Sequence, residues 1–162
     1  MGRELEVVAF ASGRRPLAVV TFLLAALLVV ALVPSDTNAE ERHGRRRQML
    51  SLTNDDRRHH ERKALDFATA ISDYAKAHSR AMAREGYLFH STEGKLSNLL
   101  DGRNWSIAGE NVGVGSTLES LEDAFMDSKK HRENILRREF FHAAVGVVRE
   151  GGRLWVTVIF YG

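Results

Sequence analysis

Three short motifs carry side chains whose chemistry could be combined at one site. They are His90-Ser91, Gly109-Glu110-Asn111 and His131-Arg132-Glu133-Asn134. Two imidazoles and one carboxylate match the ligand set of many zinc sites that keep one coordination position open. The same groups could instead hydrogen-bond to each other and hold the surrounding loops in place. The motifs are far apart in the sequence, so their spacing leaves both interpretations open.

Composition excludes several other kinds of chemistry. The 162 residues include no cysteine, which excludes thiolate nucleophiles, cysteine-ligated metals and disulfides. The sequence has no Gly-x-Ser-x-Gly elbow, no His-Glu-x-x-His helix and no Walker-type phosphate loop. The formal net charge is only +2, from 23 basic and 21 acidic side chains. A nucleic-acid-binding domain usually has a larger basic surplus, so we expect no nucleic-acid partner.

The N-terminal region has the pattern of an export signal. Residues 17–33, from Leu17 to Val33, are apolar and uncharged, follow two arginines, and precede a zone of small residues that ends at Ala39. We predict a signal peptide over residues 1–39. The alternative is an uncleaved membrane anchor, because 17 apolar residues lie at the lower limit for a span. Either interpretation predicts a secreted or extracytoplasmic domain.

A basic stretch follows this segment. We predict that residues 40–48 form a solvated linker, with weak contacts to anionic lipid or cell-wall polymer through its arginines. These are Arg42, Arg45, Arg46 and Arg47. The remaining residues, 49–162, are predicted to form one domain.

Helical patterns dominate the first half of this domain. We predict a short helix over residues 49–63 capped at Thr53, and a clearer one over residues 66–85 that ends at Gly86 and buries His78. Residues 87–91 resemble a strand, along which His90 and Ser91 would point to opposite faces. That argues against a Ser-His hydrolase pair.

The second half changes from turns to helices and then to strands. Five glycines predict an irregular segment over residues 92–115. A capping box that pairs Ser116 with Glu119 predicts a helix, and another short helix is expected to start near His131.

The C-terminal region predicts the fold class. Residues 143–148 and 154–161 are nearly all apolar and flank a Gly-Gly turn, which predicts a β-hairpin covered on both faces. Helices precede the hairpin and must provide the cover. We therefore predict an α+β fold, a three-layer α-β-α sandwich with a central antiparallel sheet that ends in this hairpin.

Taken in order, the motifs resemble those of a known family. A His-Ser, a Gly-Glu-Asn and a His-Arg-x-Asn-Ile-Leu, closed by a Gly- and Val-rich hairpin, resemble the CAP superfamily of cysteine-rich secretory, antigen 5 and pathogenesis-related-1 proteins, also called SCP domains. The resemblance covers residues 50–162 and is to the short, cysteine-free prokaryotic branch. It implies an α-β-α sandwich, in agreement with the pattern analysis.

The resemblance also implies a site. In that family two histidines and two glutamates line a cavity that binds a divalent metal in some members. The matching residues here are His90, Glu110 and His131, whereas the position of the second glutamate has Asp127 or Ser128. Ser128 or a water molecule would complete a site for zinc or another divalent cation.

Two functions are compatible with this site. The first is a non-catalytic module whose cleft binds a small molecule such as a lipid, glycan or peptide, with the three residues as a metal or polar anchor. The alternative is a metal-dependent hydrolase in which Glu110 or a bound water is the base and His90 and His131 are ligands. We favour the first, because the missing fourth residue weakens a catalytic site more than a binding site.

Overall fold

The computed structural model describes residues 37–162, with side chains from Glu40 onward. The apolar run over residues 17–33, predicted as a signal peptide or anchor, lies outside this part. Among the residues that are described, no helix is both long enough and apolar enough to cross a membrane.

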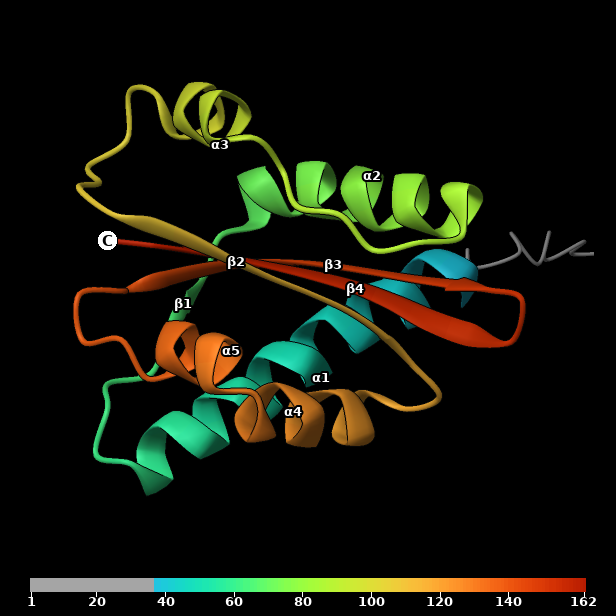
Figure 1. Ribbon diagram of the computed structural model, residues 1–162, viewed down its shortest axis with the longest axis horizontal. Coiled ribbons are helices and arrows are strands. Elements are labelled where there is room, and N and C mark those ends of the chain that lie inside the picture. Colours follow the sequence, from blue (N-terminus) through green and yellow to red (C-terminus); the bar gives the residue numbers. More distant parts are fainter. Residues whose placement is uncertain (1–36) are drawn as a thin grey trace, which may run out of the picture. The chain divides into compact units, whose positions relative to one another are not determined.

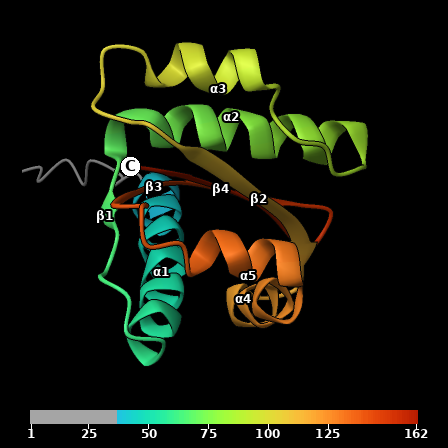
Figure 2. The ribbon, with the colours of Figure 1, turned by 60° about the vertical axis from the view of Figure 1, so that its left-hand side comes forward.

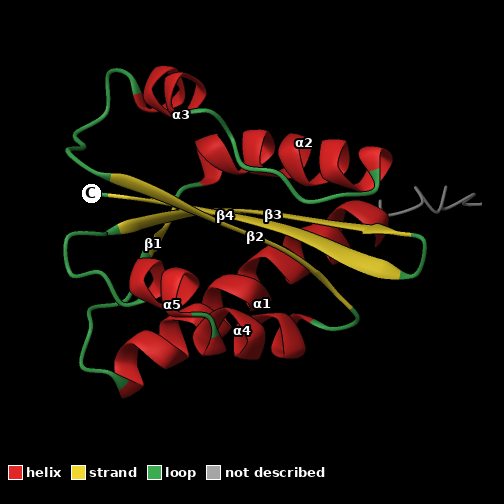
Figure 3. Ribbon diagram, viewed as in Figure 1, coloured by secondary structure: helices red, strands yellow, loops and turns green. Residues whose placement is uncertain are grey.

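The domain has three layers. Its sheet contains β1 (Asp66–Phe67), β2 (Ala108–Gly115), β3 (His142–Glu150) and β4 (Arg153–Tyr161) in the order β1-β3-β4-β2. One face is covered by α1 (Thr37–His59), α4 (Leu118–Asp127) and α5 (Lys129–Ile135), and the other by α2 (Thr69–Glu85) and α3 (Glu93–Leu100) (Figures 1 and 3). The view in Figure 2 shows the same separation of helices. This confirms the predicted α-β-α sandwich, with one addition: the short β1 pairs with β3 in parallel.

The predicted C-terminal hairpin is confirmed. β3 and β4 are antiparallel, and Glu150 pairs with Arg153 across the turn. The two turn residues, Gly151 and Gly152, have φ angles of 56° and 76°, and positive φ at both positions is what a type I′ hairpin turn requires. Both strands are apolar on both faces because helices cover both faces of the sheet.

The glycine-rich segment differs from the prediction. Residues 92–115 are not irregular throughout, since they contain α3 and β2. A Cβ at Gly113 would lie 2.9 Å from the Phe125 ring, and one at Gly115 would lie 2.8 Å from Leu121. These glycines therefore make one face of β2 flat enough for α4 to pack closely against it. Turn propensity suggested loops here, but helix packing against the sheet explains the glycines.

The predicted linker and its neighbouring helix are also replaced by a different element. Residues 40–48 belong to the 23-residue helix α1, and Thr53 is a buried residue in its interior, where we predicted a cap. Met49, Leu50, Thr53 and Arg57 form the buried face of this helix. The many charged residues around them made this face difficult to recognise in the sequence. Arg57 is only 1% exposed. Its guanidinium can be buried because it donates hydrogen bonds to four backbone carbonyls, those of Lys63, Ile135, Arg137 and Phe140.

One helix cap also differs from the prediction, and another is confirmed. Thr117, and not Ser116, caps α4, since its side chain accepts a hydrogen bond from the Ser120 N–H. Gly86 ends α2 in a left-handed conformation, as predicted.

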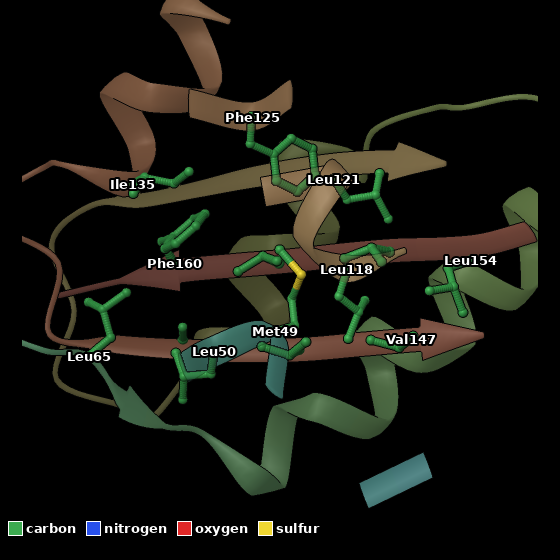
Figure 4. Close-up of a cluster of buried hydrophobic side chains, with 14 of the residues drawn as sticks. Met49, Leu50, Leu65, Leu118, Leu121, Phe125, Ile135, Val147, Leu154 and Phe160 are labelled. Carbon is green, nitrogen blue, oxygen red and sulfur yellow. The ribbon is translucent and has the colours of Figure 1, made fainter. Parts of the chain in front are cut away.

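The largest hydrophobic core lies between the sheet and the layer of α1, α4 and α5 (Figure 4). Two smaller clusters lie under α2 and α3, one around Ile71 and Ile159 and one around Met82 and Trp155. The whole sheet and both covering layers belong to one compact unit, residues Pro34–Gly162. This unit therefore has the core that a domain needs in order to fold by itself.

Candidate functional site

Glu110 lies at the centre of the predicted site, on the edge strand β2. Its side chain is only 3% exposed. Oε1 accepts a hydrogen bond from the Ser91 N–H at 2.9 Å, and Oε2 accepts one from the Ser91 hydroxyl at 2.7 Å. The Nδ1 atom of His90 lies 2.9 Å from Oε1. The carboxylate therefore joins β2 to the segment that follows α2.

The segment over residues 87–91 is not the strand that we predicted. It is not one of the four strands of the sheet, and hydrogen bonds from side chains of α2 fix its position. Nε2 of His78 lies 2.8 Å from the Phe89 carbonyl oxygen, and the Tyr74 hydroxyl donates to the Ser91 hydroxyl at 3.1 Å. Because the segment does not alternate like a strand, His90 and Ser91 reach the same carboxylate. Our argument that they point to opposite faces is wrong.

His90 is the exposed member of this cluster, with 58% of its side chain accessible to solvent. An ionised carboxylate can only accept hydrogen bonds, so the contact with Glu110 places the His90 proton on Nδ1. When the ring is neutral, Nε2 is therefore its unprotonated nitrogen. A carboxylate commonly orients a metal-binding or catalytic histidine in this way.

His131 approaches from the other layer of the sandwich. It lies in α5, and Asn111 of β2 donates a hydrogen bond to its carbonyl oxygen at 3.1 Å. Asn134 donates to the side-chain oxygen of Asn111 at 2.9 Å and therefore also ties α5 to β2. The imidazole of His131 packs edge-on against Phe125, at 5.0 Å between ring centroids. Burial, and then the nearby charge of His90, lower the pKa of His131, which favours a neutral ring.

These residues fit a three-ligand metal site poorly as they lie. Both oxygens of Glu110 are used by Ser91 and His90. Across residues 37–162, no group of three or more histidine, cysteine or acidic side chains could hold a metal ion. Ser128, the predicted fourth ligand, is the half-buried residue between α4 and α5. The metal site stays a prediction. Of the alternative, a hydrogen-bonded clamp, the structure contains the contact between His90 and Glu110. Among the described residues, the His131 ring packs against Phe125 and has no hydrogen bond to either of them.

Sequence reasoning did not assign the roles that Tyr74, Asn134 and Ser91 have in this cluster. Tyr74 lies one helical turn before His78 in α2, and Asn134 lies one turn after His131 in α5. That i, i+3 or i, i+4 spacing beside the two histidines was an available signal. The role of Ser91 had no such signal, because it depends on the irregular path of residues 87–91.

A cavity of about 580 Å³ lies on the α2–α3 side, between α3 and the start of β2. Its large apolar residues are Leu96, Trp105 and Ile107, and Glu93 is its one charged residue. Glu93 follows His90 by three residues. The volume is in the range of pockets that hold small organic ligands.

Comparisons with known proteins agree with this architecture. The family model described as the cysteine-rich secretory protein family, CAP, matches residues 50–160. YkwD of Bacillus subtilis (strain 168) is 36% identical over 98 residues, which are 57% of this chain and 38% of YkwD.

Two solved structures share the fold. One is an extracellular protein containing a SCP domain from Bacillus anthracis, with a TM-score of 0.65 and 26% identity, covering 78% of this chain and 43% of that protein. The other is an outer surface protein of Borrelia burgdorferi, with a TM-score of 0.62 and 13% identity, covering 71% of this chain and 90% of that protein. The chain spans less than half the length of YkwD and of the Bacillus anthracis protein.

Proposed function

The chain belongs to the cysteine-rich secretory protein family, CAP, and on this basis we propose that it is a non-catalytic ligand-binding module that acts outside the cytoplasm. The export pattern of residues 1–39 supports the location, as do the two structural relatives named as extracellular and outer-surface proteins.

The proposal rests on the burial and the hydrogen bonds of Glu110. A general base must be able to reach the proton that it removes, directly or through one water. The Glu110 side chain is 3% exposed, and its two oxygens accept hydrogen bonds from Ser91 and His90. The Ser91 hydroxyl is likewise held between Tyr74 and Glu110. The acidic residue of the predicted site therefore has a structural role, which favours binding over catalysis.

The cavity beside α3 supports a ligand with an apolar part and a neutral or cationic polar part. Leu96 and Trp105 are half-buried and offer an apolar surface. The single charged lining residue, Glu93, is acidic and disfavours an anionic headgroup at this position. Among the lipid, glycan and peptide ligands that the sequence leaves open, a neutral lipid fits best.

Fluorescence titration of residues 37–162 with a fluorescent monoacylglycerol tests the proposal. We expect saturable one-to-one binding, weakened roughly tenfold in Trp105→Ala through loss of aromatic contact area. Because Trp105 also packs against a core cluster, a second variant, Ser97→Phe, fills the cavity from the surface of α3 instead. Tyr87→Ala is the matched control, since Tyr87 is a 59% exposed aromatic residue outside the cavity.

Two results would contradict the proposal. One is binding that neither Trp105→Ala nor Ser97→Phe weakens. The other is turnover of an ester, peptide or glycoside that disappears in His90→Ala, which would favour the hydrolase.

A further inference from the structure

The sheet has a second edge, at β3, that is covered only at one end. β1 pairs with β3 at just two positions, Asp66 with His142 and Phe67 with Ala143. One step further, the N–H of Val145 donates to the Ser72 hydroxyl at 3.2 Å. Alternation along an antiparallel strand directs the backbone N–H groups of Val147 and Arg149 to this same edge.

Cationic side chains surround this uncovered edge. A cavity of about 470 Å³ is lined by Arg42 and Arg45 of α1, Lys76 and Arg80 of α2, and Arg149 of β3. Figure 1 shows the first turns of α1 beside the end of β3 that carries Arg149.

The acidic groups around the cavity only partly neutralise these charges. Glu41 and Glu150 also line it, so the lining has a net charge of +3. Glu41 forms an ion pair with Arg45. Within the part of the chain that the structure describes, four of these five cations have no carboxylate within 4.0 Å, namely Arg42, Lys76, Arg80 and Arg149. The cavity therefore has four cations that are available to an anionic ligand.

The close packing of α2 on β3 positions these cations. A Cβ at Gly146 would lie 2.1 Å from the Ala75 carbonyl carbon, so only glycine lets the helix backbone approach the strand this closely. Lys76 follows Ala75 in α2. Burial is the largest cause that lowers the pKa of Lys76, and the positive charges of Arg42, Arg46 and Arg80 lower it further. Asp73 has the opposite effect. Asp73 itself is 3.3 Å from Arg46.

We propose that this cavity binds a phosphate-bearing ligand with at least two negative charges. Guanidinium groups match phosphate oxygens in geometry, an ammonium adds a compact charge, and the outward N–H groups of β3 supply further donors. An anion among these side chains would also relieve their mutual repulsion. A phospholipid headgroup and a soluble phosphate compound share this chemistry. The site is at the opposite edge of the sheet from β2 and does not depend on the function proposed above.

Calorimetric titration of residues 37–162 with inorganic pyrophosphate is the first test. We expect saturable one-to-one binding. The double variant Arg42→Gln/Lys76→Gln should weaken it by at least about tenfold, which corresponds to roughly 1.4 kcal/mol. The matched control Arg47→Gln/Lys130→Gln removes the same charge from two exposed residues outside the cavity. It should change affinity by less than about twofold, because salt screens distant surface charges. Thermal melts of both variants check that they are folded.

Flotation with vesicles distinguishes the two sources of phosphate. Stronger binding to phosphatidylglycerol than to phosphatidylcholine vesicles, reduced in the cavity variant alone, would identify a lipid headgroup. Pyrophosphate binding without this preference would identify a soluble phosphate compound. Three results would overturn the proposal: no binding of either probe, an equal loss in both double variants, or equally tight binding of a hexaglutamate peptide, which would indicate strand addition to β3.

Discussion

Replacing Glu122 with glutamine should remove a large pH-dependent penalty from the stability of the domain. Glu122 lies in α4 and faces α1, with only 3% of its surface exposed. The Thr53 hydroxyl donates a hydrogen bond to Oε2 at 3.1 Å, and Oε1 is buried with no partner among the described residues. Burial raises the pKa of Glu122 from 4.5 to about 8, against the opposing effect of the Thr53 hydrogen bond.

The direction and size of the effect follow from this pKa. Between pH 4.5 and 8 the folded protein holds a proton on Glu122 that the unfolded chain has lost. Folding therefore becomes less favourable as the pH rises through this window, and below it the penalty is absent. Each pKa unit corresponds to about 1.4 kcal/mol, so the free energy of unfolding should fall by roughly 3 kcal/mol between pH 5 and 8 because of this one group.

Urea unfolding of the wild type and of Glu122→Gln at pH 5, 6, 7 and 8 measures this difference. Other groups titrate in both proteins, including His131, so only the difference between the two curves reports on Glu122. We expect the variant to gain roughly 3 kcal/mol relative to the wild type between pH 5 and 8. Glu119→Gln, an exposed glutamate of the same helix, is the control and should leave the curve unchanged. Parallel curves for the wild type and Glu122→Gln would refute the reasoning.

Two further predictions concern the core and the metal. Trp155 is 7% exposed and packs with Met82 and Val112, so Trp155→Ala should cost about 3–5 kcal/mol in denaturant unfolding by leaving a cavity; a loss below about 1 kcal/mol would contradict its place in the core. Because Glu110 is engaged by His90 and Ser91, zinc titration at pH 7 should give equally weak binding in the wild type and in His90→Ala. Tight one-to-one binding that His90→Ala abolishes would establish the predicted metal site instead.

The local pattern of the sequence was sufficient for the layers of the fold. The hairpin over β3 and β4 has two apolar runs around a Gly-Gly turn, and runs without alternation require cover on both faces. The apolar face of α2 and its glycine stop were likewise readable, because helix periodicity and capping are properties of neighbouring residues. The order of three motifs was enough to recognise the family.

Tertiary packing decided what these local signals could not. The glycines of β2 resemble loop residues until α4 is placed against them, and the buried face of α1 is hidden among charges until its partners are known. At the site, the sequence named His90 and Glu110. Only the path of residues 87–91 over α2 shows that Ser91 donates hydrogen bonds to both oxygens of the Glu110 carboxylate. The cationic cavity likewise depends on contacts between α1, α2 and β3 across distant parts of the chain, so local sequence does not determine it.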